Sequence, residues 1–166
     1  KDGVIAPHLA PWLRHFKGLH GYEVKEPYRK IVVLRPGAKT RRMTNSDELL
    51  LALKGWETVV LENMTIREQI KTFAEATHVV AAHGAGLVNL LWCKAGTKVI
   101  EIQDTNMVHK KVYPILSHHL KLKHELYLAD TVPIKLDDGK KPKGIKRLSD
   151  LINFKIDVPD LLKYLD

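Results

Sequence analysis

The segment Val79–Asn89 reads VVAAHGAGLVN, and it predicts a strand, a tight turn and a helix in immediate succession. Val79–Ala82 is an apolar run of strand length. His83–Gly86 holds two glycines and forms the turn, and Leu87–Lys94 is an apolar run predicted to be helical. A strand that leads so directly into a helix is the building unit of an α/β fold.

The same alternation of strands and helices extends on both sides of this segment. Further strands are predicted at Ile31–Leu34, Thr58–Leu61, Val99–Ile102 and Lys123–Leu128. Helices are predicted at Asp47–Trp56, after Thr65, at His109–Leu120 with Pro114 in its first turn, and at Asp160–Leu165. Strand and helix repeated about four times indicate an α/β domain, with a parallel sheet of about five strands covered by helices on both faces.

Three of the predicted helices have sequence signals of a helix N-terminus. Thr65 followed by Glu68 is a capping-box pair, in which the Thr side chain accepts from the backbone N–H of Glu68. Asn45 followed by Glu48 predicts the same arrangement at the preceding helix. Pro159 suits the first turn of the last helix, because its missing N–H would have no helical acceptor there.

Length and composition fit one folded domain. The chain has 166 residues, of which 45% are hydrophobic and 28% charged, ordinary values for a globular protein. Residues 1–29 are interpreted as an N-terminal arm or interdomain linker and 30–130 as the α/β domain. Residues 131–166 are interpreted as a basic loop and a C-terminal helix packing on the same domain, and 129–147 are expected to be loop-like. The chain begins at Lys1 and not at Met, which indicates a piece of a longer protein.

The net charge of +8 is concentrated near the start of the chain. Residues 1–45 hold ten Lys and Arg against three Asp and Glu, and the remaining residues are nearly balanced. Such a charge indicates a polyanionic partner: nucleic acid, a membrane surface or a phosphorylated ligand. No apolar run reaches the roughly 20 residues of a membrane span, and the single cysteine, Cys93, has no internal partner for a disulfide.

Three loops follow the predicted strands at one edge of the sheet: Arg35–Asn45, Glu62–Thr65 and His83–Asn89. Ligands of open α/β sheets bind outside the carboxyl ends of the strands, which meet at this edge. The basic side chains of the first loop are Arg35, Lys39, Arg41 and Arg42. Arginine pairs with phosphate oxygens through two parallel hydrogen bonds. The glycine turn of the third loop offers backbone N–H groups to an anion at a helix start.

Each of these features also has a plain structural interpretation. The glycines of the turn can serve packing alone, and a basic loop can be a solvated surface. Glu62 and Glu101 are either solvated carboxylates or acceptors for ribose and sugar hydroxyls. Gln69 lies on an exposed helical face or turns toward the site, and periodicity does not decide between the two.

Three other kinds of site are disfavoured. The glycine turn is not a dinucleotide fingerprint, because Asn89 stands where a third glycine is needed and the turn does not follow the first strand. Gly37–Thr40 lacks the preceding glycine of a Walker loop. His118, His119 and His124 do not have the spacing of a common metal site, so no metal ligand is predicted.

As a set, these motifs resemble those of family 61 glycosyltransferases, whose members include plant xylosyl- and arabinosyltransferases and animal N-acetylglucosaminyltransferases. The resemblance covers about residues 30–128, with a weaker match in the last helix. It rests on Arg35, Arg41–Leu49, Leu61–Thr65, Glu68–Ile70, His83–Asn89 and Val99–Ile102. It implies a Rossmann-like, three-layer domain that forms the C-terminal, donor-binding half of a GT-B fold.

The same resemblance implies an inverting enzyme that moves a sugar from a nucleotide sugar, usually UDP-linked, to a glycan or protein hydroxyl without a cofactor. Arg35 and Arg41 would contact or position the diphosphate, and His83 would bind the sugar or phosphate and is the candidate catalytic base. The other expected donor-binding positions are Asn45, Glu62, Gln69, Gly84, Ala85, Gly86, Leu87, Asn89 and Glu101. An N-terminal acceptor domain or a partner chain would complete the active site.

Two rival functions stay open. A non-catalytic basic module would bind nucleic acid or another polyanion. Against it, aromatic residues are sparse, at 7%, and no recognised nucleic-acid motif appears, so a nucleotide sugar is the expected partner. A nicotinamide-dependent Rossmann enzyme is disfavoured by the position of the glycine turn.

Overall fold

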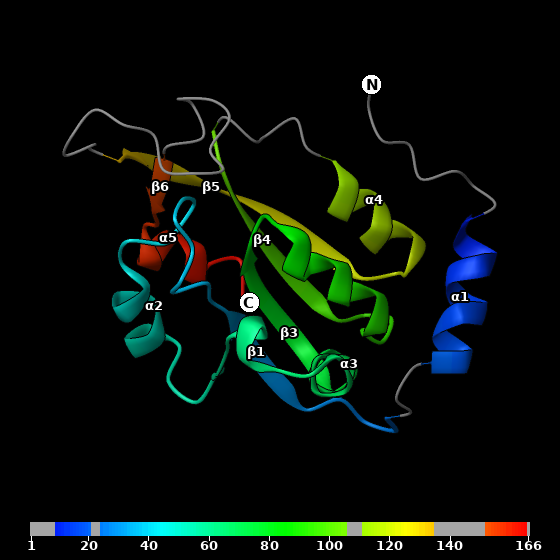
Figure 1. The fold of residues 1–166 in the computed structure, drawn as a ribbon. Helices are drawn as coiled ribbons and strands as arrows, with labels where there is room; N and C mark the ends of the chain where they lie inside the picture. The colour runs from blue at the N-terminus through cyan, green and yellow to red at the C-terminus, as the bar shows by residue number, and fades with distance from the viewer. Residues whose placement is uncertain (1–8, 21–23, 106–110, 135–151, 166) are drawn as a thin grey trace.

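The computed structural model describes residues 9–20, 24–105, 111–134 and 152–165. Within them, a six-stranded sheet has the order β2-β1-β3-β4-β5-β6 (Figure 1). Its strands are β1 Arg29–Val33, β2 Glu57–Val59, β3 Ala76–Ala82, β4 Lys98–Asp104, β5 Lys123–Pro133 and β6 Ile152–Lys155. The α-helices are α1 Leu9–His20, α2 Ser46–Ala52, α3 Ile66–Ala74, α4 Val112–His119 and α5 Val158–Leu162, and the 3-10 helices are η1 Leu61–Asn63 and η2 Ala85–Trp92.

The first five strands run parallel, and the direction of the crossovers reverses after β2. Because β1 lies between β2 and β3, the chain moves one way to β2 and the other way to β3 and β4. Since crossovers are right-handed, α2 packs on one face of the sheet, whereas α3, η2 and α4 pack on the other. The predicted α/β class, with a mostly parallel Rossmann-like sheet, is confirmed.

Each face of the sheet buries its own hydrophobic cluster, because successive strand residues point to opposite faces. In β1, Ile31 and Val33 join the cluster under α3, η2 and α4, and Val32 joins the cluster under α2 and α5. Phe16 of α1 packs against the first cluster, and its ring lies 5.9 Å from that of Trp92. Helix α1, which falls in the segment expected to be an arm, therefore reaches the core through this side chain.

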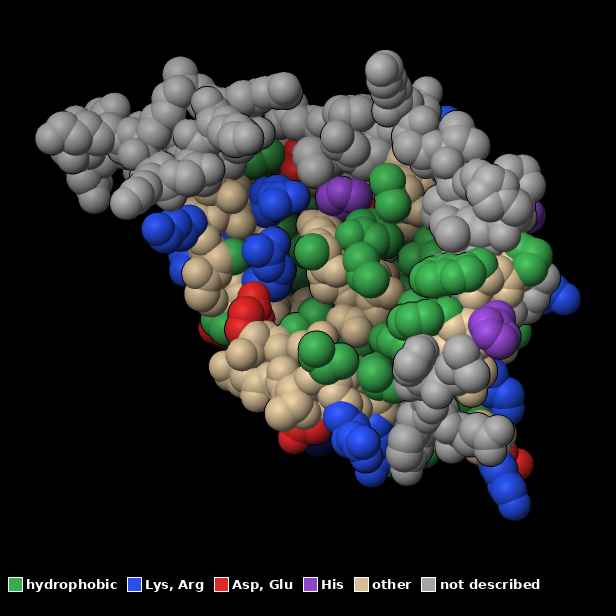
Figure 2. Space-filling view, turned by 45° about the vertical axis from the view of Figure 1, so that its right-hand side comes forward, with side chains coloured by type: hydrophobic (Ala, Val, Ile, Leu, Met, Phe, Trp, Pro, Cys, Tyr) green, Lys and Arg blue, Asp and Glu red, His purple; other side chains and the backbone are tan. Residues whose placement is uncertain are grey.

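Some large hydrophobic side chains stay at the surface. Figure 2 shows hydrophobic side chains gathered near the centre of one face, with Lys and Arg at its margins. Trp12, Val88 and Val112 are among the exposed ones in the described part of the chain. None of the helices in the described residues has the length and apolar character needed to cross a membrane.

The capping box predicted at Thr65 is confirmed. Thr65 Oγ1 accepts from the backbone N–H of Glu68 at 3.3 Å, and Glu68 Oε2 accepts from that of Thr65 at 2.7 Å. Asn45 is the N-cap residue of α2, as predicted, and its Nδ2 donates to Glu48 Oε2 at 2.9 Å. The predicted capping box does not form, because the Asn45 side chain makes no cap hydrogen bond to the backbone of α2. Asn45 Oδ1 accepts instead from the backbone N–H of Ile156 at 3.1 Å. Because this N–H is buried, the bond supplies the hydrogen-bond partner that it needs.

The helix predicted after the glycine turn is a 3-10 helix and not an α-helix. Val88 and Asn89 have low helix propensity. Asn89 Nδ2 donates to the Gly86 carbonyl at 3.2 Å. This local bond competes with the α-helical pattern and favours the tighter turn.

The remaining predicted helices form with shifted ends. α2 ends at Ala52 instead of Trp56, and α5 begins at Val158 instead of Asp160. Pro159 lies in the first turn of α5, as predicted. Pro114 likewise lies in the first turn of α4. The first two residues of the helix predicted from His109 are outside the described residues.

The prediction of a loop from residue 129 onward is wrong at its start. β5 continues to Pro133, and β6, which was not predicted, pairs antiparallel with the second half of β5. β6 has four residues that alternate apolar and polar, a strand signal that the prediction missed, and Asp130–Pro133 offers it a partner. The rest of the predicted loop, residues 135–147, lies outside the described residues.

The segment containing β6 also holds the basic loop that follows β1. The N–H of Arg41 donates to the Ile152 carbonyl at 2.6 Å, and that of Thr44 donates to the Phe154 carbonyl at 2.9 Å. Asn45 extends this ladder, because its Nδ2 donates to the Ile156 carbonyl at 2.9 Å while its Oδ1 accepts from the Ile156 N–H. The C-terminal segment therefore fixes a loop that lies 111 residues earlier in the chain.

Asn45→Ala is expected to lower the free energy of unfolding by about 2 kcal/mol, because the buried N–H and carbonyl of Ile156 lose these partners. Urea unfolding followed by circular dichroism measures the loss. Asn63→Ala removes an exposed amide and is the matched control, with an expected change below about 0.5 kcal/mol. Equal stability of Asn45→Ala and the parent chain would contradict the role assigned to Asn45.

Candidate functional site

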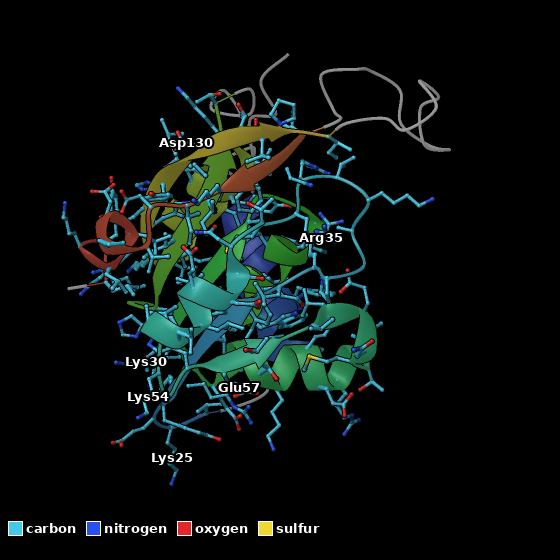
Figure 3. All side chains as sticks on the ribbon, turned by 90° about the vertical axis from the view of Figure 1, so that its left-hand side faces the viewer. Lys25, Lys30, Arg35, Lys54, Glu57 and Asp130 are labelled. Atoms are coloured by element: carbon cyan, nitrogen blue, oxygen red, sulfur yellow. The ribbon has the colours of Figure 1, made fainter. Side chains whose placement is uncertain are left out.

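A pocket of about 410 Å³ opens at the carboxyl ends of β1 and β3, where the two crossovers diverge. Ligands of doubly wound sheets bind at this position. Its walls come from the ends of β1 and β3, from η1 and α3, and from the glycine turn that begins η2. Figure 3 shows Arg35 at this edge of the sheet and Lys30 at the opposite edge. We call this cavity the switch-point pocket.

Arg35 follows β1, and its guanidinium passes close to the glycine turn. A Cβ atom at Gly84 would lie 3.4 Å from Arg35 Nη1, an ordinary van der Waals contact, so the glycine turn and the guanidinium lie side by side. Arg35 Nε lies 3.9 Å from Glu62 Oε1, and the two side chains are 36% and 59% exposed. An ion pair this exposed is weak, so the positive charge of Arg35 remains available to an anion in the pocket.

Gly86 allows the glycine turn to approach η1 closely. A Cβ atom at Gly86 would come within 2.7 Å of Leu61 Cδ1, closer than any ordinary carbon contact. The second glycine of the turn therefore has a packing role. The first glycine, Gly84, lies beside Arg35 and lines the pocket.

The side-chain amides of Gln69 and Asn89 stabilise the wall of the switch-point pocket through hydrogen bonds. Gln69 Nε2 donates to the carbonyls of Leu61 and Met64 at 3.1 and 3.3 Å. Gln69 Oε1 accepts from Asn89 Nδ2 at 3.0 Å. Gln69 thus turns toward the site, which periodicity had left open, and it joins α3 to η1 and η2.

Arg41 reaches the same pocket from the end of the basic loop. Its φ of 55° is in the left-handed region, which non-glycine residues rarely adopt. The hydrogen bond from its N–H to Ile152 in β6 holds this conformation. A second pocket of about 300 Å³ adjoins the first, shares Leu34 and Arg35 with it, and is also lined by Arg42.

His83 belongs to a buried polar cluster. Its Nδ1 is hydrogen-bonded to Glu101 Oε1, and Glu101 Oε2 accepts from His124 Nε2 at 3.0 Å. His124 Nδ1 is in turn bonded to Ser117 Oγ at 2.7 Å. Because an ionised carboxylate can only accept, the nitrogen that each imidazole turns to Glu101 carries a proton. Glu101 therefore fixes the tautomer and the orientation of His83.

The pKa of Glu101 reflects opposing effects. Burial raises it, but hydrogen bonds from His124, His83 and Gln103 lower it more, and the pKa is about 2 instead of the ordinary 4.5. Glu101 is therefore ionised at neutral pH although it is fully buried. Burial and the charge of Glu101 raise the pKa of Tyr113, whose ring lies 5.3 Å from that of His83.

The structure brings most of the expected donor-binding residues to one cavity. Those that line the switch-point pocket are Arg35, Arg41, Glu62, Gln69, Gly84, Ala85, Gly86, Leu87 and Asn89. Asn45, His83 and Glu101 are not part of its lining. Asn45 holds the C-terminal segment, and His83 and Glu101 form the buried cluster.

The partners of Glu101 were not predicted from the sequence. The sequence identifies His124 only as a disfavoured metal ligand and gives no signal for Ser117. Their contacts join β4, α4 and β5, so no local spacing reveals them. Gln103, two residues after Glu101 and on the same face of β4, is the one partner that strand periodicity indicates. In the described part of the chain, no group of three or more His, Cys, Asp or Glu is placed to hold a metal ion.

A doubly wound sheet with basic loops at its switch point is the architecture of domains that bind phosphorylated or nucleotide ligands. Residues 4–100 match the model of the family described as Glycosyltransferase 61. The chain therefore belongs to glycosyltransferase family 61. The matched range begins before residue 30 and ends in β4, so it differs at both ends from the range expected from the motifs.

A curated relative is the β-1,2-xylosyltransferase RCN11 of Oryza sativa subsp. japonica. It is 30% identical to this chain over an alignment of 98 residues, which covers 53% of this chain and 18% of the rice protein. The chain thus spans less than a fifth of the length of that relative.

Glu101→Gln tests the buried cluster by removing one negative charge with little change of shape. At pH 7 we expect a loss of about 2–3 kcal/mol in the free energy of unfolding, because charge-assisted hydrogen bonds to two imidazoles are weakened. The pKa of Glu101 is lowered in the fold, so its ionisation stabilises the protein above the ordinary value of 4.5 and ceases to do so as the pH falls toward 2.

The difference in stability between Glu101→Gln and the parent chain should therefore shrink between pH 5 and pH 3, as measured by urea unfolding. Glu62→Gln changes an exposed carboxylate and is the matched control. A stability difference that stays constant over this pH range would contradict an ionised Glu101.

Proposed function

We propose that this chain is the donor-binding domain of an inverting glycosyltransferase that uses a nucleotide sugar, with UDP as the nucleotide. The observation that carries the proposal is the convergence of Arg35, Arg41 and the Gly84–Gly86 turn on one cavity at the switch point. A nucleotide sugar has a diphosphate between its two organic parts. Planar guanidinium groups and closely approaching backbone are suited to that diphosphate.

The two adjoining pockets support a ligand of this shape. The switch-point pocket and its smaller neighbour are about 410 and 300 Å³, and both include Arg35 in their lining. Cavities of a few hundred Å³ hold small organic ligands. A diphosphate beside Arg35 would place the nucleoside and the sugar in the two cavities on either side.

The arginines would act on the leaving group. Transfer breaks the bond between the anomeric carbon and a diphosphate oxygen, and negative charge develops on the diphosphate as it departs. Positive charge that is already in place stabilises this charge without a metal ion. In this mechanism Arg35 and Arg41 act on the diphosphate, and Gln69 and Asn89 keep the wall of the pocket in position.

His83 is the candidate for contact with the sugar or for removal of the acceptor proton. Because its Nδ1 proton is directed at Glu101, the neutral imidazole presents Nε2 as an acceptor. An acceptor nitrogen of this kind can bind a sugar hydroxyl or take a proton from it. The acceptor must attack from the face opposite the diphosphate, which produces inversion.

We assign the acceptor-binding part to an N-terminal domain or a partner chain, as in a GT-B enzyme.

Isothermal titration calorimetry with UDP tests the donor site. Arg35→Ala and Arg41→Ala should each weaken UDP binding about tenfold or more, because each removes a charge-assisted contact to the diphosphate. Arg67→Ala removes an exposed arginine of α3 outside the pocket lining and should leave the affinity unchanged. Absence of UDP binding at millimolar concentration, or equal affinity of Arg41→Ala and the parent chain, would contradict the proposal.

UDP-xylose is the first sugar donor to compare with UDP, because the rice relative is named a xylosyltransferase. A gain in affinity over UDP would support a contact to the sugar, and His83→Ala should reduce that gain. The rival basic module makes a different prediction: a single-stranded oligonucleotide would bind with steep salt dependence and would not be displaced by UDP.

A further inference from the structure

The amino-terminal ends of the strands carry a line of basic side chains at the edge opposite the switch-point pocket. In the register of the sheet, Lys30 of β1 lies beside His78 of β3, His78 beside Lys98 of β4, and Lys98 beside Lys123 of β5. Residues paired in this way project from the same face of a sheet. Strands lie about 4.8 Å apart, so the line extends over about 14 Å. We call these four residues the basic row.

Contacts with Trp56 confirm that the row occupies one face. The Lys30 Nζ lies 6.0 Å from the centroid of the Trp56 ring, and the His78 ring lies 5.7 Å from it. Trp56 packs against the cluster under α2 and α5. Lys30 and His78 therefore lie at the margin of that cluster, at the edge where Figure 3 shows Lys30.

The row concentrates positive charge without a counter-charge. Like charges on directly opposed residues destabilise a sheet. Among the described residues, none of the ion pairs involves Lys30, Lys98 or Lys123. Burial and the charges of these three lysines lower the pKa of His78. A bound anion would relieve this repulsion.

Two carboxylates near the N-terminal edge of the sheet pair with Arg29, and a third shares the face of the row on β5. Glu57 and Glu75 both accept from Arg29, at 2.6 and 2.7 Å. Glu125 is two residues beyond Lys123 on the same face of β5. Glu125 therefore limits the positive surface on β5, which favours a compact ligand over a long polyanion.

A pocket of about 460 Å³ lies at this edge and is lined by His78, Lys94, Lys98 and Lys123. The Lys94 Nζ donates to the Lys25 carbonyl at 2.7 Å, so its charge is held near the pocket. Three members of the basic row and one further lysine therefore face a single cavity. Its volume suits a small molecule.

We propose that this pocket and the basic row bind a small anion with two or more phosphate-type groups, at a site separate from the switch-point pocket. The lysines provide point charges for the oxyanions, and protonation of His78 adds a second ring N–H donor and a positive charge. The spacing of the row allows two charged groups of one ligand to be bound by different pairs of basic side chains. The proposal does not depend on the donor site.

Inorganic pyrophosphate is the probe, added at pH 7 while the ring signals of His78 are followed by NMR and assigned by their loss in His78→Asn. Saturable movement toward the positions of the protonated imidazole is expected, because the anion offsets the charges of the lysines. Lys98→Ala/Lys123→Ala should weaken the binding roughly tenfold or more. Circular dichroism checks that this variant is folded.

Two control variants separate this site from general attraction and from the donor pocket. Lys155→Ala/Lys163→Ala removes the same charge; Lys155 pairs with Asp130, which Figure 3 shows far from Lys30. This variant and Arg35→Ala/Arg41→Ala should both keep the response of His78. Loss of the response in either control, or no saturable movement at about 10 mM pyrophosphate, would overturn the proposal. Sulfate binding as tightly as pyrophosphate would overturn the assignment to a ligand with more than one charged group.

Discussion

The position of β1 between β2 and β3 is the constraint on which the rest of this structure depends. Right-handed crossovers that run in opposite directions along the sheet, from β1 to β2 and from β2 to β3, must cover opposite faces of the sheet. The carboxyl ends of β1 and β3 are consequently not covered by a helix, and the switch-point pocket opens there. The same arrangement brings the loop after β1 and the glycine turn after β3 to one cavity, although 48 residues separate Arg35 from His83.

The C-terminal segment supplies the second constraint. The loop Arg35–Asn45 carries four basic side chains that repel one another, so its own sequence does not favour a single conformation. Backbone pairing of this loop with residues 152–154, completed by Asn45, holds it at the pocket and allows the left-handed conformation of Arg41. The contacts that fold the C-terminal segment therefore also position Arg41 at the pocket, so the proposed donor binding would depend on the folding of this segment.

The fold class was predictable from the sequence, whereas the details of the site were less so. Strand runs such as Ile31–Val33 are buried on both faces and are visible as continuous apolar segments. The Thr65 cap was predicted because it depends on residues three apart. Asn45 is the N-cap residue of α2, as predicted, but the capping box does not form, because its side-chain oxygen accepts from a tertiary partner, the N–H of Ile156.

The sequence by itself determined the strand and helix periods, the three loops at the carboxyl edge and the residue types suited to a phosphate. These are local properties, set by side-chain size, branching and charge. The tertiary structure decided which of those residues share a cavity, that His83 and Glu101 meet His124 in a buried cluster, and that Lys30, His78, Lys98 and Lys123 fall into one row. Strand order and register decide such contacts, and they arise from packing over the whole chain, which no short spacing in the sequence records.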